Sequence, residues 1–450
     1  MITSLNPYNQ KVVYEFSELS TAQLEEKLKL AHSTFLSWRL GPMEERVECM
    51  RSVAGILREN KALYGKTITL EMGKPIAQSL AEIEKCAWVC EYYAQNAHRQ
   101  LKDEIIKTDA SKSYVRYEPL GPILAIMPWN FPFWQVFRFA APNLMAGNVG
   151  LLKHASNVMR CAQVIEMIFE KAGFPKGCFQ NLTIKSDKIP SILESDIVKA
   201  VTLTGSEGAG ASVAATAGKN IKKSLLELGG NNALIVFRDA DIQRTLEICV
   251  QARFLNTGQS CIAGKRLLIH SDIAEEFTQR LVEEVAQLKS GDPMDLETYI
   301  GVLAREDLAR DLEKQVYASV AMGAKILVGG KRDKAFFEPT VLVQVTRDMP
   351  IFREETFGPV IGITVFKKDE EALALSNDSH FGLGVSLFTS NTKKIESLIP
   401  FFNEGAVFIN ELVKSDPRLP FGGVKLSGYG RELSSHGIRE FVNAKTVYIS

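Results

Sequence analysis

The sequence predicts an α/β protein with two doubly wound parallel sheets and a small β arm. First, short apolar runs alternate with helical stretches from residue 122 to residue 237, a pattern typical of a parallel sheet that is covered on both faces. Second, the same alternation begins again near residue 244. Third, polar and apolar residues alternate in an isolated segment at residues 111–119, which indicates a half-exposed strand outside both sheets.

The individual elements follow from the same periodicities. Residues 21–99 carry apolar residues at three- and four-residue spacing, interrupted by GPMEER and MGKP, and this predicts about three helices. Strands of the first sheet are expected at PILAIMP, VGLLK, CFQNLTI, KAVTLTG and ALIVF, with a helix at residues 157–173. The second unit is expected to contain helices at residues 244–256, 275–290 and 370–377 and strands at residues 265–270, 361–366 and 405–410, before a terminal strand at residues 445–450.

Composition excludes several classes of function. Lys and Arg together number 53 and so do Asp and Glu, so the zero formal charge predicts no nucleic-acid partner and no polybasic membrane anchor. No apolar run approaches the roughly 18 residues of a membrane span, and the N-terminus lacks the pattern of an export signal. Seven cysteines are too sparse, and odd in number, for a disulfide framework, which predicts a cytoplasmic protein. The pair Cys86 and Cys90 has no second ligand pair nearby, so no metal site is expected.

Cys261 is the first candidate for chemistry. A cysteine of unknown context is most often a small buried hydrophobe. Cys261, however, lies in NTGQSC after a predicted helix, where Gly258 permits a sharp turn and Ser260 leaves space. Such a turn offers a thiolate access, polar surroundings and backbone N–H groups, so a nucleophile is the competing interpretation.

Glu227 is the second candidate. It ends an apolar strand and is followed by Gly229 and Gly230, so its carboxylate could face a cleft and act on water as a general base. A solvated strand-end carboxylate is an equally valid interpretation. A third interpretation is that Glu227 binds the ribose of a cofactor. It follows Gly205 by 22 residues, about the spacing expected between a glycine-rich turn and a ribose-binding acid. That turn, from Gly205 to Gly210, has the spacing G-x-x-G-x-G and opens a small-residue helix whose N-terminus could face a phosphate.

The segment MPWNFPFWQVFRFAAPN supplies the remaining candidates. Pro132 suits the first turn of a helix, which places Asn130 at the helix entry and Trp134 and Arg138 on one face. The Asn130 amide could donate to an oxyanion. Arg138 lies in an apolar segment and needs an anion, which is either an internal carboxylate or a ligand.

Together these stretches resemble the aldehyde dehydrogenase superfamily over nearly the whole chain. Six separated motifs carry the resemblance: PWNFP, LTGSEGAG, ELGG, NTGQSC, EETFGPV and PFGGVKLSGYGRE. It implies an aldehyde dehydrogenase-like fold, with a cofactor-binding domain of residues 1–100 and 120–228 and a catalytic domain of residues 229–430. Residues 101–119 and 431–450 would form an arm through which such enzymes make homodimers or homotetramers.

The resemblance also implies the roles of individual residues. Cys261 would be the nucleophile, Glu227 the general base for water, and Asn130 an oxyanion donor. The remaining implied roles are contacts with the cofactor, NADP or NAD, at Trp129, Lys153, Ser156, Gly205, Ser206, Glu355 and Phe357. Many relatives have KPxE where this chain has KHAS at residues 153–156. A serine in place of that acid favours NADP, because its hydroxyl can donate to a 2′-phosphate that a carboxylate would repel.

The substrate predicted from the resemblance is a small aldehyde with a carboxylate tail. Similarity to enzymes of succinate semialdehyde is closest at FWQVFR and at INELVKSDPRLPFGG, which makes Trp134, Arg138 and Ser415 the expected substrate-binding residues. Lactaldehyde and glutarate semialdehyde are alternative substrates. A CoA-acylating enzyme is a further alternative, against which Glu227 argues, and a cysteine hydrolase without redox activity is an alternative from another class.

Overall fold

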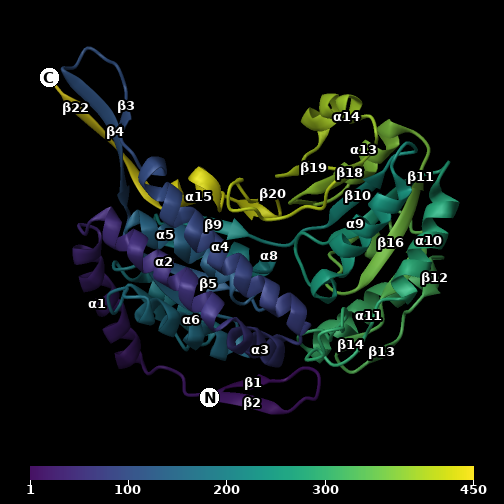
Figure 1. The fold of residues 1–450 in the computed structure, drawn as a ribbon, viewed down its shortest axis with the longest axis horizontal. Helices are drawn as coiled ribbons and strands as arrows, with labels where there is room; N and C mark the ends of the chain where they lie inside the picture. Colours follow the sequence, from purple (N-terminus) through teal and green to yellow (C-terminus); the bar gives the residue numbers. More distant parts are fainter.

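A six-stranded sheet lies at the centre of one half of the molecule (Figure 1). The structure is a computed structural model that describes residues 1–450, with the exception of the Lys394 side chain. The strand order is β21-β9-β8-β5-β6-β7, and all neighbours are parallel except β21, which is antiparallel to β9. The strands are β5 (Pro122–Met127), β6 (Val149–His154), β7 (Phe179–Asn181), β8 (Ala200–Thr204), β9 (Lys223–Glu227) and β21 (Gly428–Tyr429).

Helices surround this first sheet. They are α1 (Thr21–Trp38), α2 (Met43–Glu59), α3 (Lys61–Met72), α4 (Ile76–Gln100), α5 (Trp134–Ala146), α6 (Met159–Lys171), α7 (Ile189–Glu194), α8 (Glu207–Lys219) and α15 (Ser434–Arg439), with the hairpin β1 (Ile2–Leu5) and β2 (Val12–Phe16). The N-terminal region contains four helices rather than three. The additional boundary falls at Asn60, whose φ of −107° and ψ of 18° are not helical, and no glycine or proline marks it.

A seven-stranded sheet lies at the centre of the other half, with the order β12-β15-β16-β11-β10-β18-β19. Its strands are β10 (Asn232–Val236), β11 (Gly264–His270), β12 (Lys325–Val328), β15 (Thr340–Val343), β16 (Val360–Phe366), β18 (Val385–Phe388) and β19 (Val407–Ile409). Successive residues of β10 alternate between two apolar clusters: Ala233 and Ile235 in one, Leu234 and Val236 in the other. This burial on both faces explains the continuous apolar run ALIVF. The expectation that ALIVF belongs to the first sheet was wrong, because β10 lies within the second sheet.

The elements around the second sheet complete this half. They are α9 (Ile242–Phe254), α10 (Ala274–Ala286), α11 (Glu306–Ala321), α12 (Pro350–Arg353), α13 (Asp369–Asn377) and α14 (Thr392–Leu398), with the pairs β13 (Arg332–Asp333)/β14 (Phe336–Phe337) and β17 (Phe381–Gly382)/β20 (Val424–Lys425). The chain returns to the first sheet late. The strand β21 falls within residues 229–430, yet it pairs with β9 through Gly428 and Glu227.

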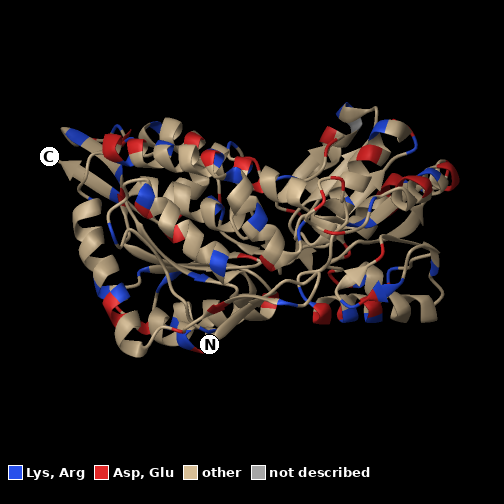
Figure 2. Ribbon diagram, turned by 60° about the horizontal axis from the view of Figure 1, so that its bottom comes forward, with Lys and Arg blue, Asp and Glu red and all other residues tan. Residues whose placement is uncertain are grey.

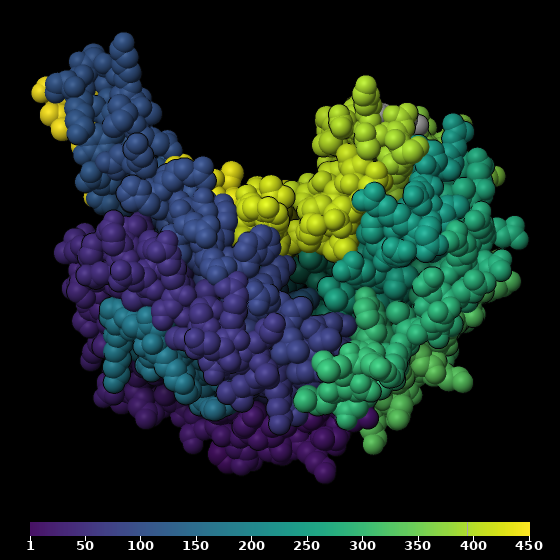
Figure 3. Space-filling model, in the orientation of Figure 1, coloured from purple at the N-terminus to yellow at the C-terminus, as the bar shows by residue number. Residues whose placement is uncertain are grey.

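A three-stranded antiparallel sheet projects from the body (Figure 1). It consists of β3 (Glu104–Ile105), β4 (Lys112–Pro119) and β22 (Val442–Ile449), with β4 in the middle. Residues 431–450 do not form one unit, because α15 packs against α5 and α4 and only β22 belongs to the projecting sheet. The space-filling view shows a broad hollow between this arm and the upper part of the second half (Figure 3).

Charged residues of both signs are interspersed over the ribbon in Figure 2. Among the described residues, none of the helices is both long and apolar enough to cross a membrane. Within the same residues, no group of three or more His, Cys, Asp or Glu side chains is arranged to hold a metal ion.

Candidate active site

The site begins at the carboxyl edge of the first sheet, where four parallel strands end at the same level. The register pairs Met127 with His154 and Thr204 with Glu227, so the chain leaves β5, β6, β8 and β9 side by side. The strand order reverses between β5 and β8, and ligands of open α/β sheets bind at such switch points. The segments that follow these strands carry most of the residues expected to bind the cofactor.

Lys153, Ser156 and Ser206 lie at this edge. Lys153 is the penultimate residue of β6 and its side chain is buried, and burial lowers the pKa of its ammonium group. Ser156 is exposed at the first position of the 3-10 helix η1 (Ser156–Val158). Ser206 is the N-cap of α8, where its side chain accepts a hydrogen bond from the Ala209 N–H at 3.4 Å.

The space beside the α8 N-terminus fits a phosphate-bearing cofactor. A Cβ atom built on Gly208 would meet no atom within 4 Å, so the first turn of α8 faces open space. N–H groups of a first helical turn have no partners within the helix and attract anions. Gly205 opens this turn, and the Gly205 N–H is held by the Glu227 carbonyl oxygen at 3.0 Å. The structure therefore supports the prediction of a dinucleotide site here.

Trp129 and Phe357 lie together although 228 positions separate them in the sequence. Their rings meet edge to face with centroids 5.6 Å apart. The neighbouring Glu355 forms an ion pair with Lys265 at 3.1 Å and accepts a hydrogen bond from the Gly230 N–H at 3.0 Å. These contacts bring EETFGPV of the second half against PWNFP of the first.

The two glycines of ELGG allow this convergence. A Cβ atom at Gly229 would lie 2.7 Å from Glu355 Oε2, and one at Gly230 would lie 2.5 Å from the carbonyl oxygen of Cys261. Both distances are too short for any side chain. ELGG therefore contributes Glu227 to the site and also leaves room for Glu355 and Cys261 to approach.

Cys261 follows a tightly held turn. Asn256, Thr257 and Gly258 all have positive φ, between 54° and 71°, so three successive residues are left-handed. Asn256 Nδ2 donates to the Asn130 carbonyl oxygen at 2.8 Å, which helps to hold this uncommon conformation. Lys265 Nζ donates to the carbonyl oxygens of Ser260 and Cys261, at 2.8 Å each.

Burial raises the pKa of the Cys261 thiol to about 11, and the nearby charges of Lys265 and Arg138 counteract part of that rise. The two groups that the sequence predicts as oxyanion donors have the following contacts. Asn130 Nδ2 donates one hydrogen bond to the Gln259 carbonyl oxygen at 3.2 Å. The side-chain amide has a second N–H that can donate to another acceptor. Among the described residues, the Cys261 backbone N–H has no hydrogen-bond partner.

Glu227 is almost completely buried at the end of β9, with 1% of its surface exposed. Neither carboxylate oxygen has a hydrogen-bond partner in the part of the chain that the structure describes. Burial raises the pKa of the Glu227 carboxyl group to about 8. The charge of Glu432 adds to this rise, and the charge of Arg138 opposes it. A Cβ atom at Gly422 would lie 2.7 Å from Glu227 Oε1, so the PFGG turn leaves space for this carboxylate.

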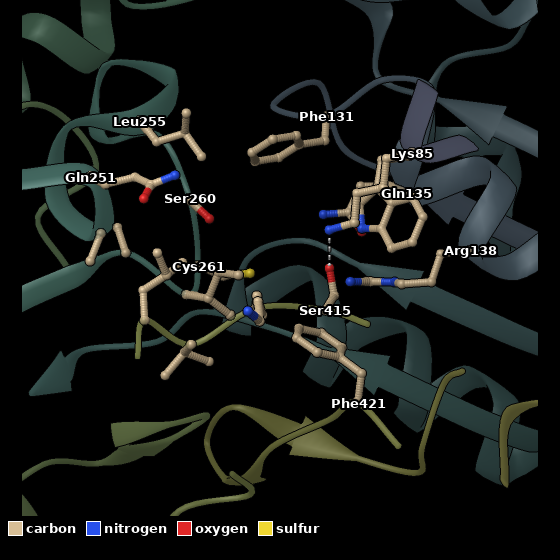
Figure 4. Close-up of a pocket in the computed structure, with 17 residues that line it drawn as sticks. Lys85, Phe131, Gln135, Arg138, Gln251, Leu255, Ser260, Cys261, Ser415 and Phe421 are labelled. Atoms are coloured by element: carbon tan, nitrogen blue, oxygen red, sulfur yellow. Dashed lines mark hydrogen bonds between the residues drawn. The ribbon is translucent and has the colours of Figure 1, made fainter. Parts of the chain in front are cut away.

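A cavity of about 110 Å³ lies in front of Cys261. Figure 4 shows the Cys261 sulfur on one side and Ser415 and Arg138 on the other. Trp134, Phe131 and Phe421 also line the space. Drug-sized ligands need roughly 300 Å³ or more, so this cavity suits only a small molecule. The structure thus brings Cys261, Trp134, Arg138 and Ser415 together, while Asn130 and Glu227 lie outside the described lining.

Arg138 both pairs with an internal carboxylate and faces the cavity, the two alternatives that the sequence left open. Its guanidinium group forms a buried ion pair with Glu432 and lies over the Phe421 ring, 4.6 Å from the centroid. It also lines the cavity. The internal partner Glu432 belongs to the motif PFGGVKLSGYGRE but was not among the expected site residues, since a sequence does not reveal a pairing over such a distance along the chain.

Lys85 of α4 is a second cation in the cavity that sequence reasoning missed. Lys85 Nζ donates to Ser415 Oγ at 2.8 Å and lies 4.2 Å from the centroid of the Trp134 ring (Figure 4). The run AEIEKCAWVCEYYAQ predicts an amphipathic helix, in which a lysine is ordinarily a solvated residue. The sequence therefore carries no signal that singles out Lys85.

Comparisons with known proteins agree with this geometry. A model described as the aldehyde dehydrogenase family matches residues 1–447. A probable succinate-semialdehyde dehydrogenase (NADP+) of Synechocystis sp. is 50% identical over 453 residues, which cover 100% of both proteins. A succinate semialdehyde dehydrogenase (NAD(P)+) of Escherichia coli is 44% identical over 448 residues, covering 99% of this chain and 97% of that protein.

Solved structures show the same fold. The crystal structure of succinic semialdehyde dehydrogenase from Streptococcus pyogenes, in complex with NADP+ as the cofactor, superposes with a TM-score of 0.97. That protein is 37% identical in sequence, and the match covers 100% of both chains.

Proposed function

Because this chain belongs to the aldehyde dehydrogenase family, we propose that it oxidises succinate semialdehyde to succinate, with NADP+ as the preferred cofactor. The observation that carries the proposal is the small cavity that places Cys261 opposite two cations and the Ser415 hydroxyl. A nucleophile on one side and an anion-binding group on the other suit a short aldehyde with a terminal carboxylate. The names of the similar proteins support the same substrate and cofactor.

The protein residues act in two stages. The Cys261 thiolate adds to the aldehyde carbon, and the resulting oxyanion receives hydrogen bonds from the Asn130 amide and the Cys261 N–H. NADP+, when bound, supplies the hydride acceptor. Cys261 is then left as a thioester, and Glu227 removes a proton from the water molecule that attacks it. Collapse releases the carboxylic acid and returns the thiolate.

The cofactor would be held by residues of both halves. Lys153 and Ser156 would contact the adenine ribose and its 2′-phosphate, and Gly205 and Ser206 the pyrophosphate at the α8 N-terminus. Trp129, Glu355 and Phe357 would hold the nicotinamide half, since their contacts join PWNFP to EETFGPV.

Replacing Ser156 by glutamate is expected to raise the KM for NADP+ by at least about tenfold and to change that for NAD+ much less. Like charges about 4 Å apart repel by roughly 1 to 4 kcal/mol at a protein surface, and only NADP+ carries the 2′-phosphate. Steady-state kinetics with each cofactor measure the effect. Ser186→Glu is the matched control, because Ser186 is also an exposed first residue of a 3-10 helix. A tenfold preference of the wild type for NAD+ would contradict the assignment of Ser156.

The direct test of the function compares succinate semialdehyde with butanal, which has the same chain length and no carboxylate. We expect NADPH formation, followed at 340 nm, with a clearly higher kcat/KM for succinate semialdehyde. A preference for butanal would refute the substrate assignment. Lactaldehyde and glutarate semialdehyde belong in the same panel as alternative substrates, and a requirement for coenzyme A would indicate the acylating reaction instead.

We also propose that the projecting sheet joins subunits in a homodimer or homotetramer. The strand β22 forms one edge of that sheet with no further strand beside it among the described residues. Ile105, Ile106, Tyr448 and Ile449 expose apolar surface there. Light scattering is expected to give at least twice the mass of one chain, whereas removal of residues 442–450 should give monomers. A monomeric wild type would refute the proposal.

All seven cysteines are free thiols, which supports a reducing compartment such as the cytoplasm.

A further inference from the structure

The two cations of the substrate cavity differ in their partners. Arg138 already has an acidic partner, Glu432, in a buried ion pair. Lys85 Nζ instead donates to the neutral hydroxyl oxygen of Ser415 and lies over the Trp134 ring. No carboxylate lies within ion-pair distance of Lys85 Nζ among the residues that the structure describes. The cavity therefore contains one positive charge without a direct counter-ion.

The two carboxylates whose charges act on Lys85, Glu82 and Asp416, are paired with other cations. Glu82 forms an ion pair with Lys74 and accepts hydrogen bonds from the Phe133 and Trp134 N–H groups, at 2.9 Å each. Asp416 is paired with Arg418, with 2.6 Å between Oδ2 and Nη2. A positive charge held in partly buried surroundings without an acid of its own gains from binding an anionic ligand.

We propose that Lys85 binds the far carboxylate of the substrate and so selects aldehydes that end in a carboxylate. The proposal rests on the proposed function, the oxidation of succinate semialdehyde. Since Lys85 donates to Ser415 Oγ, the Ser415 hydroxyl hydrogen is directed elsewhere and is available to the same carboxylate. Arg138 lines the same side of the cavity and adds a second positive field.

The Trp134 ring fixes the position of the ammonium group. A cation close to the face of an indole ring is attracted by the ring quadrupole, and the 4.2 Å separation is within the usual range. Trp134 thus has two roles in the proposal: it forms a wall for the methylene chain and it orients Lys85 towards Ser415.

Lys85 also lines a second, neighbouring cavity. A neighbouring cavity of about 380 Å³ shares Lys85, Phe131, Trp134 and Leu255 with the cavity in front of Cys261. Lys85 therefore borders both cavities.

Replacing Lys85 by methionine is expected to lower kcat/KM for succinate semialdehyde by at least about thirtyfold, since loss of a desolvated charge partner is costly. Methionine retains most of the apolar stem of the side chain. The loss for butanal should be much smaller, so the ratio of the two kcat/KM values should fall at least about tenfold. Lys66→Met is the matched control, because Lys66 is an exposed lysine of α3, and it should leave the ratio unchanged.

The wild type provides a second test that does not depend on the folding of a variant. Burial and the charge of Arg138 lower the pKa of Lys85 to about 8, while Cys86, Glu82 and Asp416 raise it. Lys85 is charged below this pH and neutral above it. The ratio of kcat/KM for succinate semialdehyde to that for butanal should therefore fall at least about fivefold between pH 7 and pH 9.5. Cys261 and Glu227 act on both substrates, so their titrations cancel in the ratio.

The outcomes separate this proposal from the proposed function. If the wild type prefers succinate semialdehyde, but neither Lys85→Met nor alkaline pH lowers the ratio, Lys85 does not bind the carboxylate and the function stands. If the wild type shows no preference for succinate semialdehyde, the function itself is refuted. Equal losses on both aldehydes in Lys85→Met, with a flat pH profile of the wild-type ratio, would assign Lys85 a structural role and overturn the proposal.

Discussion

Replacing Cys261 by alanine is expected to abolish aldehyde oxidation, with a fall in kcat of at least about a thousandfold, and to leave cofactor binding almost unchanged. Only the covalent step needs the sulfur. The turn that holds Cys261 should persist, because Lys265 binds the carbonyl oxygens of Ser260 and Cys261 and not the thiol. Steady-state oxidation at 340 nm and titration with NADPH fluorescence measure the two properties separately.

Cys49→Ala is the control for this experiment. Cys49 is a partly exposed cysteine of α2, and its replacement should leave activity intact. Residual oxidation by pure Cys261→Ala at more than a few per cent of the wild-type rate would refute the role of Cys261. Loss of NADPH binding in the same variant would show instead that the substitution had disturbed the fold of the site.

Replacing Glu227 by glutamine is expected to preserve the first half-reaction and to stop the second. The thioester should form in a burst of NADPH close to one equivalent per site, after which turnover should fall at least about a hundredfold because the water has lost its base. Rapid mixing at 340 nm distinguishes the burst from the steady rate. Glutamine has nearly the same shape, so the space beside Gly422 should still accommodate the side chain.

The pH dependence supplies a second readout for Glu227. Burial raises the pKa of this carboxyl group to about 8, so the ionised base accumulates above that pH and is lost below it. Where thioester hydrolysis limits the wild type, kcat should rise through an inflection near pH 8, and Glu227→Gln should lack that inflection. Glu170→Gln, at an exposed position of α6, is the control. Absence of a burst, or undiminished turnover, in Glu227→Gln would contradict the assignment.

The sequence predicts those parts of the site that local pattern determines. Glu227 ends a strand, and Cys261 follows a turn that requires Gly258, and both features are visible in short stretches of sequence. Trp134 and Arg138 follow from the helix phase of one segment. The expectation for Asn130 was wrong in detail, because α5 begins only at Trp134, so Pro132 precedes the helix and Asn130 lies in the turn before it. The motif matches extend these assignments to Glu355 and Phe357, whose contact with the first half no local pattern reveals.

The remaining parts depend on approaches between distant segments. Lys85 and Ser415 are separated by 330 positions, and nothing in the helical run around Lys85 distinguishes it from a surface lysine. Likewise, the apolar surroundings of Arg138 indicate that it needs an anion, but only the folded chain identifies Glu432 as that anion. The helix boundary at Asn60 was not predicted for a different reason, since no glycine or proline marks it in the sequence.

The late return of the chain to the first sheet has a consequence for biosynthesis. The strands β5 to β9 leave the ribosome long before Gly422, Gly428 and Glu432, which later lie beside Glu227 and pair with Arg138. Contacts so distant in sequence form slowly, and domains of large proteins fold as they emerge. During translation, Glu227 and Arg138 therefore remain hydrated, and the perturbed acidity of Glu227 arises only when the C-terminal segment docks. We expect the nascent chain to be inactive until this last segment has been released.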